Sequence, residues 1–491
     1  MAKRKQQSTF ERLTSGKLNR KQRKELIRKI EAEDPGLEIV YRNAAGIDVG
    51  NESHLVSVPE DRDAKPIREF GSWTADLHAM ADWLQACGIE SVVMQSTGVY
   101  WIALYDLLEK RGFRICLTNA RDTRNLPGRK SDVAEAQWLR KLYSYGLLRN
   151  SFRPSEQIRS LRSVWRLRDR HVKEAAEEIQ HMQKVLTQMN VQLANAISDI
   201  SGMTGQAIIR AILMGERDPY KLADLRDYRV HATREEIARS LEGSWDENLL
   251  FELQQVVDRY DFCHKQIAAC DQRLRVLLAA IPDAAEKQPG PPAGTESTAD
   301  PPVGAGRGKK RQKAEQKPRK NQPAGFDLEA ELTRICGVNL QRIEGVKLMT
   351  ITTFVSEVGT DMSAFRTEDH LVSWLNLSPK RKVSGGKLLN HEKVRNKNRA
   401  AAALRMAAST LRQSDSYLGA RFRALRARLG EPRAIKAMAA YLARLIYRML
   451  TKGAEWVDRG AQEFETRRKA RQTYVLKRMA TDLGYELVPV S

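Results

Sequence analysis

Three acidic residues in the first third of the chain have types and spacing suited to phosphate chemistry. Asp48 ends a short apolar run in the segment GIDVG, and Asp132 and Glu135 lie three residues apart in a segment with helical periodicity. Residues three apart share one face of a helix, and Mg²⁺ prefers such oxygen ligands and keeps an open side for phosphate. Taken by themselves, Asp132 and Glu135 are explained as ordinary acidic residues in the first turn of a helix, where the helix dipole favours negative charge. With Asp48 and the order of the elements, they predict a magnesium site.

A serine in a strongly basic segment is the second candidate for chemistry. Ser384 precedes Gly385-Gly386, and residues 380–399 hold eight Lys or Arg against one Glu. Glycines let a backbone approach a phosphate, and a serine hydroxyl needs a base, a metal or surrounding cations to become a nucleophile. From the residue types alone, a turn serine in a DNA-binding loop is the favoured interpretation. Ser378, ahead of Pro379, is the alternative nucleophile.

Residues 44–150 predict the sheet and helices that would bring the acidic residues together. Apolar runs predict strands, and amphipathic runs that end at glycine predict helices, with Ser131 as a cap of the last one. In chain order these are strands at 44–50, 54–58 and 66–71, a helix at 74–88, a strand at 91–95, a helix at 99–112, a strand at 113–118 and a helix at 131–146. This order is that of the RNase H-like (RuvC-like) fold, an α/β class.

The rest of the chain predicts mainly helical structure. Residues 151–281 carry two seams of apolar residues at alternating steps of three and four, over 172–200 and 249–277. Such seams are typical of an antiparallel helix pair or of a dimerising coiled coil. The expected domains are a basic arm (1–43), the RuvC-like domain (44–150), a helical coiled-coil domain (151–281), a Pro/Gly/Lys-rich linker (282–326), a helical C-terminal domain with the serine (327–455) and a basic tail (456–491).

The charge of the whole chain points to a polyanionic partner. Its 491 residues have a formal net charge of +22, and so basic a protein usually binds nucleic acid. Residues 1–30 alone hold eleven Lys or Arg against two Asp or Glu, either as a phosphate-contacting arm or as a solvated tail. The five cysteines form no CxxC pair, which indicates a reducing compartment. With no apolar run long enough for a bilayer, we expect a cytoplasmic, nucleoid-associated protein of bacterial type and no membrane partner.

Three segments together resemble a known family. The strings MQSTGVYW (94–101) and LTNARDTRNLPGRKSDVAEAQWL (117–139), followed by SGGK (384–387), are similar to the DEDD-type insertion-sequence transposases of the IS110 group, also described as bridge-RNA-guided recombinases. The likeness runs from about residue 44 to residue 455, interrupted by the linker. It implies a RuvC-like domain, a coiled-coil spacer and a C-terminal domain with a serine nucleophile. As partners it implies target and donor DNA and a structured noncoding RNA.

The resemblance assigns roles to individual residues. It makes Ser384 the nucleophile and maps the family's acidic set onto Asp48, position 95, Asp132 and Glu135, with Mg²⁺ as cofactor. Two positions depart from the family: Gln95 stands where the family has Glu, and Glu135 where Asp is usual. Gln95 offers a carbonyl oxygen without charge, so magnesium should bind more weakly unless Glu52 or a phosphate compensates.

Basic residues beside the two sites are the predicted nucleic-acid contacts, although a solvated loop explains the first four equally well. They are Arg121, Arg124, Arg129, Lys130, Lys380, Arg381, Lys382, Lys387, Lys393 and Arg395. The main interpretation is a homo-oligomeric (dimeric or tetrameric) RNA-guided DNA recombinase. Two alternatives remain open: a RuvC-like nuclease that cuts branched DNA without a covalent adduct, and a nucleic-acid-binding protein with weak catalysis, which Gln95 would suggest.

Overall fold

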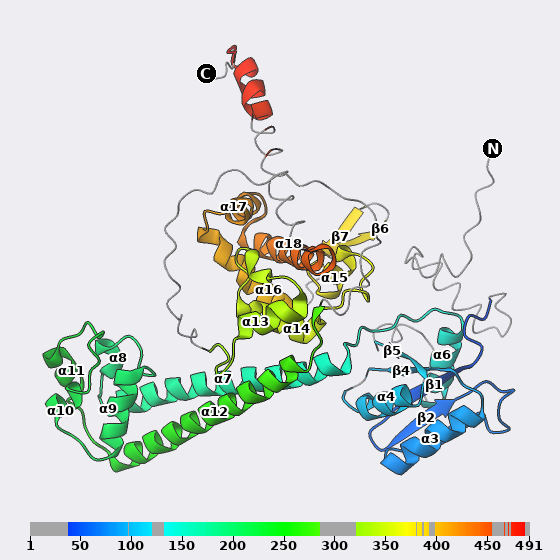
Figure 1. The fold of residues 1–491 in the computed structure, drawn as a ribbon, viewed down its shortest axis with the longest axis horizontal. Coiled ribbons are helices and arrows are strands. Elements are labelled where there is room, and N and C mark those ends of the chain that lie inside the picture. The colour runs from blue at the N-terminus through cyan, green and yellow to red at the C-terminus, as the bar shows by residue number, and fades with distance from the viewer. Residues whose placement is uncertain are drawn as a thin grey trace. The chain divides into compact units, whose positions relative to one another are not determined.

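The computed structural model describes residues 38–96, 98–119, 132–284, 321–379, 381–384, 387–391 and 398–453, and then 466, 470 and 473–486. For residues 132–134, 381–384 and 387–391 it describes the backbone only. The chain divides into two compact units, Met1–Arg153 and Pro154–Ser491. Each unit has its own arrangement of elements (Figure 1).

The first unit is built on a five-stranded mixed sheet. Its strands are β1 (Ala44–Val49), β2 (Ser53–Ser57), β3 (Ile67–Gly71), β4 (Ser91–Gln95) and β5 (Arg114–Thr118), and its helices are α3 (Thr74–Ala86), α4 (Trp101–Lys110) and α6 (Asp132–Ser144). The strand order is β3-β2-β1-β4-β5. β2 is antiparallel to β1 and β3, whereas β4 is parallel to β1 and β5. The predicted succession of strands and helices is confirmed, with ends that coincide or differ by one or two residues.

The two faces of this sheet bury different helices. Ile47, Val56 and Met94 pack with α3 and α4 in the larger apolar cluster. On the opposite face, Ala44 and Val93 pack against Leu139 of α6. Successive side chains of a strand point to opposite faces, so the register of β1 and β4 determines which residues meet α6.

Two long helices dominate the beginning of the second unit. α7 (Glu156–Gln188) and α12 (Glu247–Ala279) each have 33 residues, about 50 Å of helix. They run antiparallel, because Gln157 donates a hydrogen bond to the carbonyl of Ala280 while Ala175 and Met182 of α7 share a core with Val256 of α12. Both seams therefore pack within one chain. Cys263 and Cys270 are buried, as expected of seam residues.

The first seam ends earlier than the sequence predicted. An apolar repeat to residue 200 was expected, but α7 stops at Gln188 and Asn190 adopts a φ of +57°. Asparagine tolerates this left-handed conformation, which ends a helix. The remaining apolar residues fold into the end of the hairpin with short helices: α8 (Leu193–Ala196), α9 (Met203–Leu213), α10 (Pro219–Ala223) and α11 (Arg234–Ser240).

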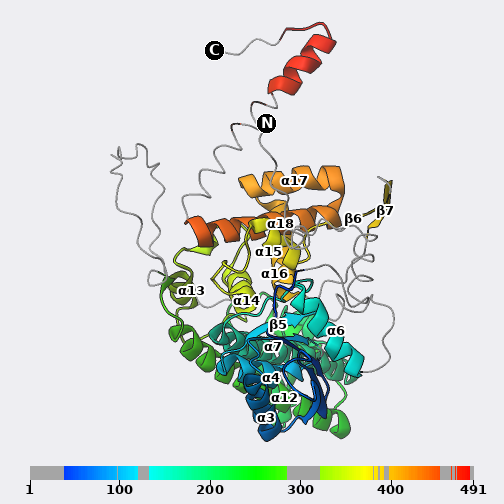
Figure 2. The same ribbon diagram turned by 90° about the vertical axis from the view of Figure 1, so that its right-hand side faces the viewer.

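The rest of the second unit is a group of helices with one small sheet. The helices are α13 (Leu328–Cys336), η2 (Leu340–Arg342), α14 (Leu348–Val358), α15 (Glu368–Trp374), α16 (Arg399–Thr410), η3 (Leu411–Gln413), α17 (Tyr417–Leu429) and α18 (Glu431–Lys452). α18 packs against α15, α16 and α17, and α14 packs against α7 and α16. Residues 473–482 form a further helix. Figure 2 shows β6 (Arg381–Ser384) and β7 (Lys387–His391) at the periphery of these helices.

Candidate functional sites

The first candidate site lies where β1 and β4 end. β1 and β4 are parallel neighbours with Ile47 opposite Met94, so Asp48 and Gln95 follow at the same edge of the sheet. Both lie on the α6 face, because side chains two residues apart on a strand point to the same face. Gln95 is two residues after Val93, which packs against α6, and Asp48 is two residues after Gly46, which contacts the α6 backbone. Asp48 is half-buried and Gln95 is 6% exposed.

A glycine in β1 lets α6 come close to this edge. A Cβ at Gly46 would lie 2.3 Å from the carbonyl oxygen of Ala136 and 2.6 Å from the amide nitrogen of Arg140. Both contacts are with helix backbone, so no side chain fits there. The other end of α6 is held by Ser144, whose carbonyl accepts hydrogen bonds from the amides of Val40 and Tyr41. The first turn of α6 is thereby aligned with the ends of β1 and β4.

The close approach joins two of the predicted site residues. Nε2 of Gln95 donates a hydrogen bond to Oε1 of the half-buried Glu135 over 2.5 Å. Without a metal, a glutamate at position 95 would face another carboxylate, whereas the amide of Gln95 gives Glu135 a donor. Gln95 is therefore more than a neutral replacement, which residue type alone did not reveal.

The oxygen atoms at this edge are of the kind that magnesium prefers. Asp48 and Glu135 supply carboxylates, and Gln95 retains an amide oxygen. Among the side chains that the structure describes, no three of His, Cys, Asp or Glu form a group that could hold a metal ion. Asp132 is the first residue of α6, but its side chain lies outside the described part. The four-residue ligand set therefore remains a prediction.

A buried histidine lies behind the end of β1, on the other face of the sheet. His54 pairs with Val49 across β1 and β2 and is 2% exposed. No described group forms a hydrogen bond with its Nδ1. Burial lowers the pKa of His54 below its ordinary value, so the folded chain favours a neutral imidazole next to the strand that carries Asp48.

The second candidate site is the hairpin that carries Ser384. A basic loop was expected here, but β6 and β7 form an antiparallel pair in which Ser384, the last residue of β6, is opposite Lys387. The expectation of a loop was wrong. A Gly-Gly pair between two short runs is a hairpin signal in the sequence, and the prediction did not use it. The register shifts between Lys382 and Val383.

The predicted basic contacts are only partly within the described residues. Arg381 and Lys382 belong to β6 and Lys387 to β7, each with its backbone alone described. The remaining predicted contacts lie outside the described part: Arg121, Arg124, Arg129, Lys130, Lys380, Lys393 and Arg395. Their roles stay predictions. Ser378, the alternative nucleophile, accepts a hydrogen bond at its carbonyl from Nζ of Lys436.

The fold of the first unit defines a class of protein. A mixed sheet with this strand order, followed by a largely helical remainder, is compatible with an RNase H-like DEDD domain.

Comparisons with known families narrow the class. Residues 45–191 match a family model of DEDD-type IS110 transposases, described as "Transposase", and residues 338–423 match one described as "Transposase IS116/IS110/IS902 family". The first match contains Asp48, Gln95 and Glu135, which we call the acidic edge of the sheet, and the second contains the β6–β7 hairpin with Ser384. They support an IS110-type DNA transposase of an insertion sequence. A comparison with curated proteins finds no match. None of the helices that the structure describes has the length and apolar character needed to cross a membrane.

Proposed function

We propose that this transposase cuts and rejoins DNA through Ser384, with a magnesium site at Asp48, Gln95, Asp132 and Glu135. The observation that carries the proposal is the convergence of Asp48, Gln95 and Glu135 on one edge of an RNase H-like sheet. A second, independent observation is the basic hairpin of the other unit, whose first strand ends on Ser384. Both features lie within segments that match transposase families.

The proposed reaction consists of two successive phosphoryl transfers. The hydroxyl oxygen of Ser384 attacks a DNA phosphorus, loses its proton to a base, and forms a phosphoserine ester while a DNA hydroxyl leaves with a proton. A hydroxyl of another DNA end then attacks the same phosphorus and loses its proton to a base, while the serine oxygen leaves and takes up a proton, which restores the Ser384 hydroxyl. Lys380, Arg381, Lys382 and Lys387 would stabilise the added negative charge on the phosphate. A bound magnesium ion would supply Lewis-acid stabilisation of phosphate oxygens.

We further infer that a structured noncoding RNA and a second copy of the chain take part. The RNA follows from the family resemblance of the motifs, and the net charge of +22 is compatible with polyanionic partners. Phe251 and Phe262 of α12 are 68% and 56% exposed, and we propose this part of α12 as the surface that the second copy covers. Light scattering that shows a monomer, free and on DNA, would contradict the second inference.

The test is excision of the insertion element from a donor plasmid, with RNA transcribed from the DNA that flanks the gene. We expect recombinant junctions with the wild-type chain and RNA, and none with Asp48→Asn or after ribonuclease treatment. Junctions that form equally without RNA would contradict guidance. Cleavage without rejoining would favour the RuvC-like nuclease. DNA binding without cleavage would favour a weakly catalytic nucleic-acid-binding protein.

A further inference from the structure

The chain that leads into the Ser384 hairpin is fixed to the helical core. Leu375 is fully buried and Leu377 is 2% exposed. One residue later, Nζ of Lys436 in α18 donates a hydrogen bond to the carbonyl oxygen of Ser378 over 3.2 Å. The backbone is therefore anchored to α18 six residues before Ser384.

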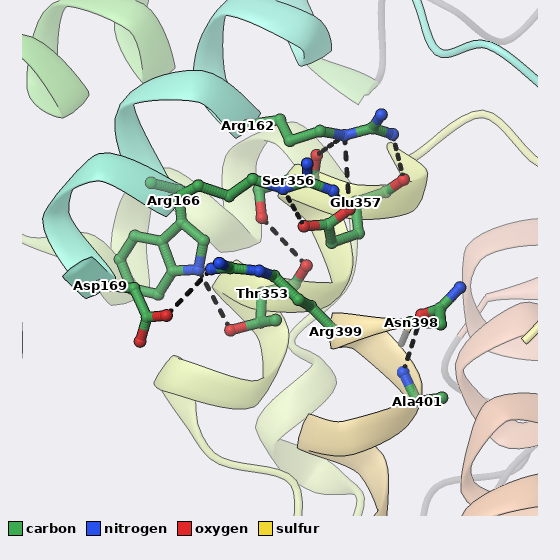
Figure 3. A network of polar contacts seen from close by, with 10 residues as sticks. Arg162, Arg166, Asp169, Thr353, Ser356, Glu357, Asn398, Arg399 and Ala401 are labelled. Carbon is green, nitrogen blue, oxygen red and sulfur yellow. Dashed lines mark hydrogen bonds and ion pairs between the residues drawn. The ribbon is translucent and has the colours of Figure 1, made fainter. Parts of the chain in front are cut away.

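The chain that leaves the hairpin is fixed to a different helix. Asn398 caps α16 by accepting a hydrogen bond at Oδ1 from the amide of Ala401 over 3.0 Å. The next residue, Arg399, donates from Nη1 to Oδ2 of Asp169 in α7 over 2.9 Å (Figure 3). Asp169 is 230 residues away in the sequence. The chain is thus anchored to α18 before the β6–β7 hairpin, at Ser378, and to α7 after it, at Arg399.

The face of α7 that carries Asp169 is hydrogen-bonded to α14. Arg166 forms two hydrogen bonds of 2.8 and 2.7 Å with the carboxylate of Glu357, whose side chain is only 6% exposed. Arg162 donates to the carbonyl oxygens of Ser356 and Glu357 near the C-terminal end of α14. Residues 162, 166 and 169 follow the spacing of one helix face, and Figure 3 shows their side chains meeting α14 and α16. The hydrogen bonds of Arg162 and Arg166 to α14 therefore fix the part of α7 that carries Asp169.

We propose that Asp169 is a positioning residue, which holds the start of α16 through Arg399 and thereby sets the place of the β6–β7 hairpin. The proposal rests on the proposed function of Ser384. The Asp169 and Arg399 side chains are 40% and 41% exposed, and ion pairs this open add little to stability. Phosphoryl transfer, in contrast, depends steeply on where the nucleophile lies. Losing this pair should therefore affect the reaction far more than the fold.

A second ion pair of the same unit provides a matched control. Arg210 of α9 and Asp261 of α12 form hydrogen bonds of 2.6 and 2.8 Å, with side chains that are 43% and 36% exposed. This pair resembles Asp169–Arg399 in residue type and exposure but lies among the short helices at the end of the α7–α12 hairpin. Arg210 forms two hydrogen bonds with Asp261, whereas Asp169 accepts one from Arg399 and one from Nζ of Lys173 over 2.8 Å. Asp169→Ala and Asp261→Ala each remove a half-exposed carboxylate from a helix and leave the arginine in place.

The experiment measures backbone hydrogen exchange of residues 381–391, the melting temperature, DNA affinity and the rate of covalent adduct formation in the full-length chain. In Asp169→Ala we expect faster exchange in β6 and β7 and an adduct rate reduced about tenfold, with melting temperature and DNA affinity close to wild type. Asp169→Glu, which can still reach Arg399, should restore slow exchange and most of the rate. Asp261→Ala should match wild type in all four measurements.

The outcomes separate this proposal from the proposed function. Unchanged hydrogen exchange of β6 and β7 in Asp169→Ala overturns the positioning role. The same exchange increase in Asp261→Ala also overturns it, because it would indicate general loosening of the α7–α12 helix pair. If exchange responds as expected but the wild-type chain forms no adduct with DNA, the positioning of β6 and β7 stands and the serine chemistry fails.

Discussion

Replacing Gln95 with glutamate tests the acidic edge, because it puts a second carboxylate where an amide now donates to Glu135 over 2.5 Å. A hydrogen bond to a charged group contributes about 1.5–3 kcal/mol, and the variant loses it. Two like charges about 4 Å apart repel by about 4 kcal/mol at an effective dielectric constant of 20. Proton uptake by the pair limits this cost, so we expect Gln95→Glu to lose about 2–4 kcal/mol in metal-free buffer.

Magnesium should reverse this loss, because a cation between the carboxylates removes their repulsion. At a concentration 100 times Kd, a ligand adds about 2.7 kcal/mol of stability. For a unit of this size we expect the melting temperature to fall by roughly 5–10 °C with chelator and to recover with magnesium. The measurement is thermal melting of both proteins in chelator and in magnesium, together with magnesium titration by calorimetry.

A matched control adds the same charge elsewhere in the unit. Gln85→Glu places a carboxylate on the exposed side of α3 and should show no magnesium dependence beyond wild type. If Gln95→Glu melts like wild type in chelator and gains nothing from magnesium, the reasoning about Glu135 is refuted. The edge would then not be a metal site.

Three further predictions concern the scaffold and the partner. Gly46→Val should cost about 3 kcal/mol in urea denaturation, because its Cβ would lie 2.3 Å from the carbonyl of Ala136; unchanged stability would mean that α6 does not pack there. Because burial lowers the pKa of His54 from 6.5, its contribution to stability is complete above pH 6.5 and is lost as the pH falls through the lower, folded value. Melting of wild type between pH 7.5 and 5 should therefore drop more steeply than that of His54→Phe, while a variant of the exposed His231, His231→Phe, should follow wild type; parallel curves would contradict this. DNA affinity should fall steeply between 50 and 200 mM salt, and a flat dependence would exclude the basic segments as phosphate contacts.

The sequence predicted the first unit well because its signals are local. Alternating and amphipathic runs closed by Gly88 and Gly112 fix the order of strands and helices, and both glycines adopt positive φ. That order already places Asp48 and Gln95 at neighbouring strand ends. The hydrogen bond between Gln95 and Glu135 was not predictable, because it depends on how closely α6 approaches β1.

The contacts of α7 were missed for a different reason. Arg168 and Asp271 form an almost fully buried ion pair, and Asp169 meets Arg399, yet these partners are 103 and 230 residues apart. In a single sequence, a charged residue on a helix is normally interpreted as solvent-exposed. Nothing local marks which arginines of α7 face α12, α14 or α16, so charge pairs at this separation need the tertiary fold.

The most direct test of the central claim is to locate the covalent bond between protein and DNA. The wild-type chain is incubated with labelled DNA of the element ends and the RNA, denatured, digested, and analysed by mass spectrometry for a nucleotide-linked peptide. We predict a single phosphoserine ester at Ser384, absent in Ser384→Ala and retained in Ser378→Ala, with DNA binding unchanged in both variants. An adduct that persists in Ser384→Ala, or that maps to another residue, would contradict the account.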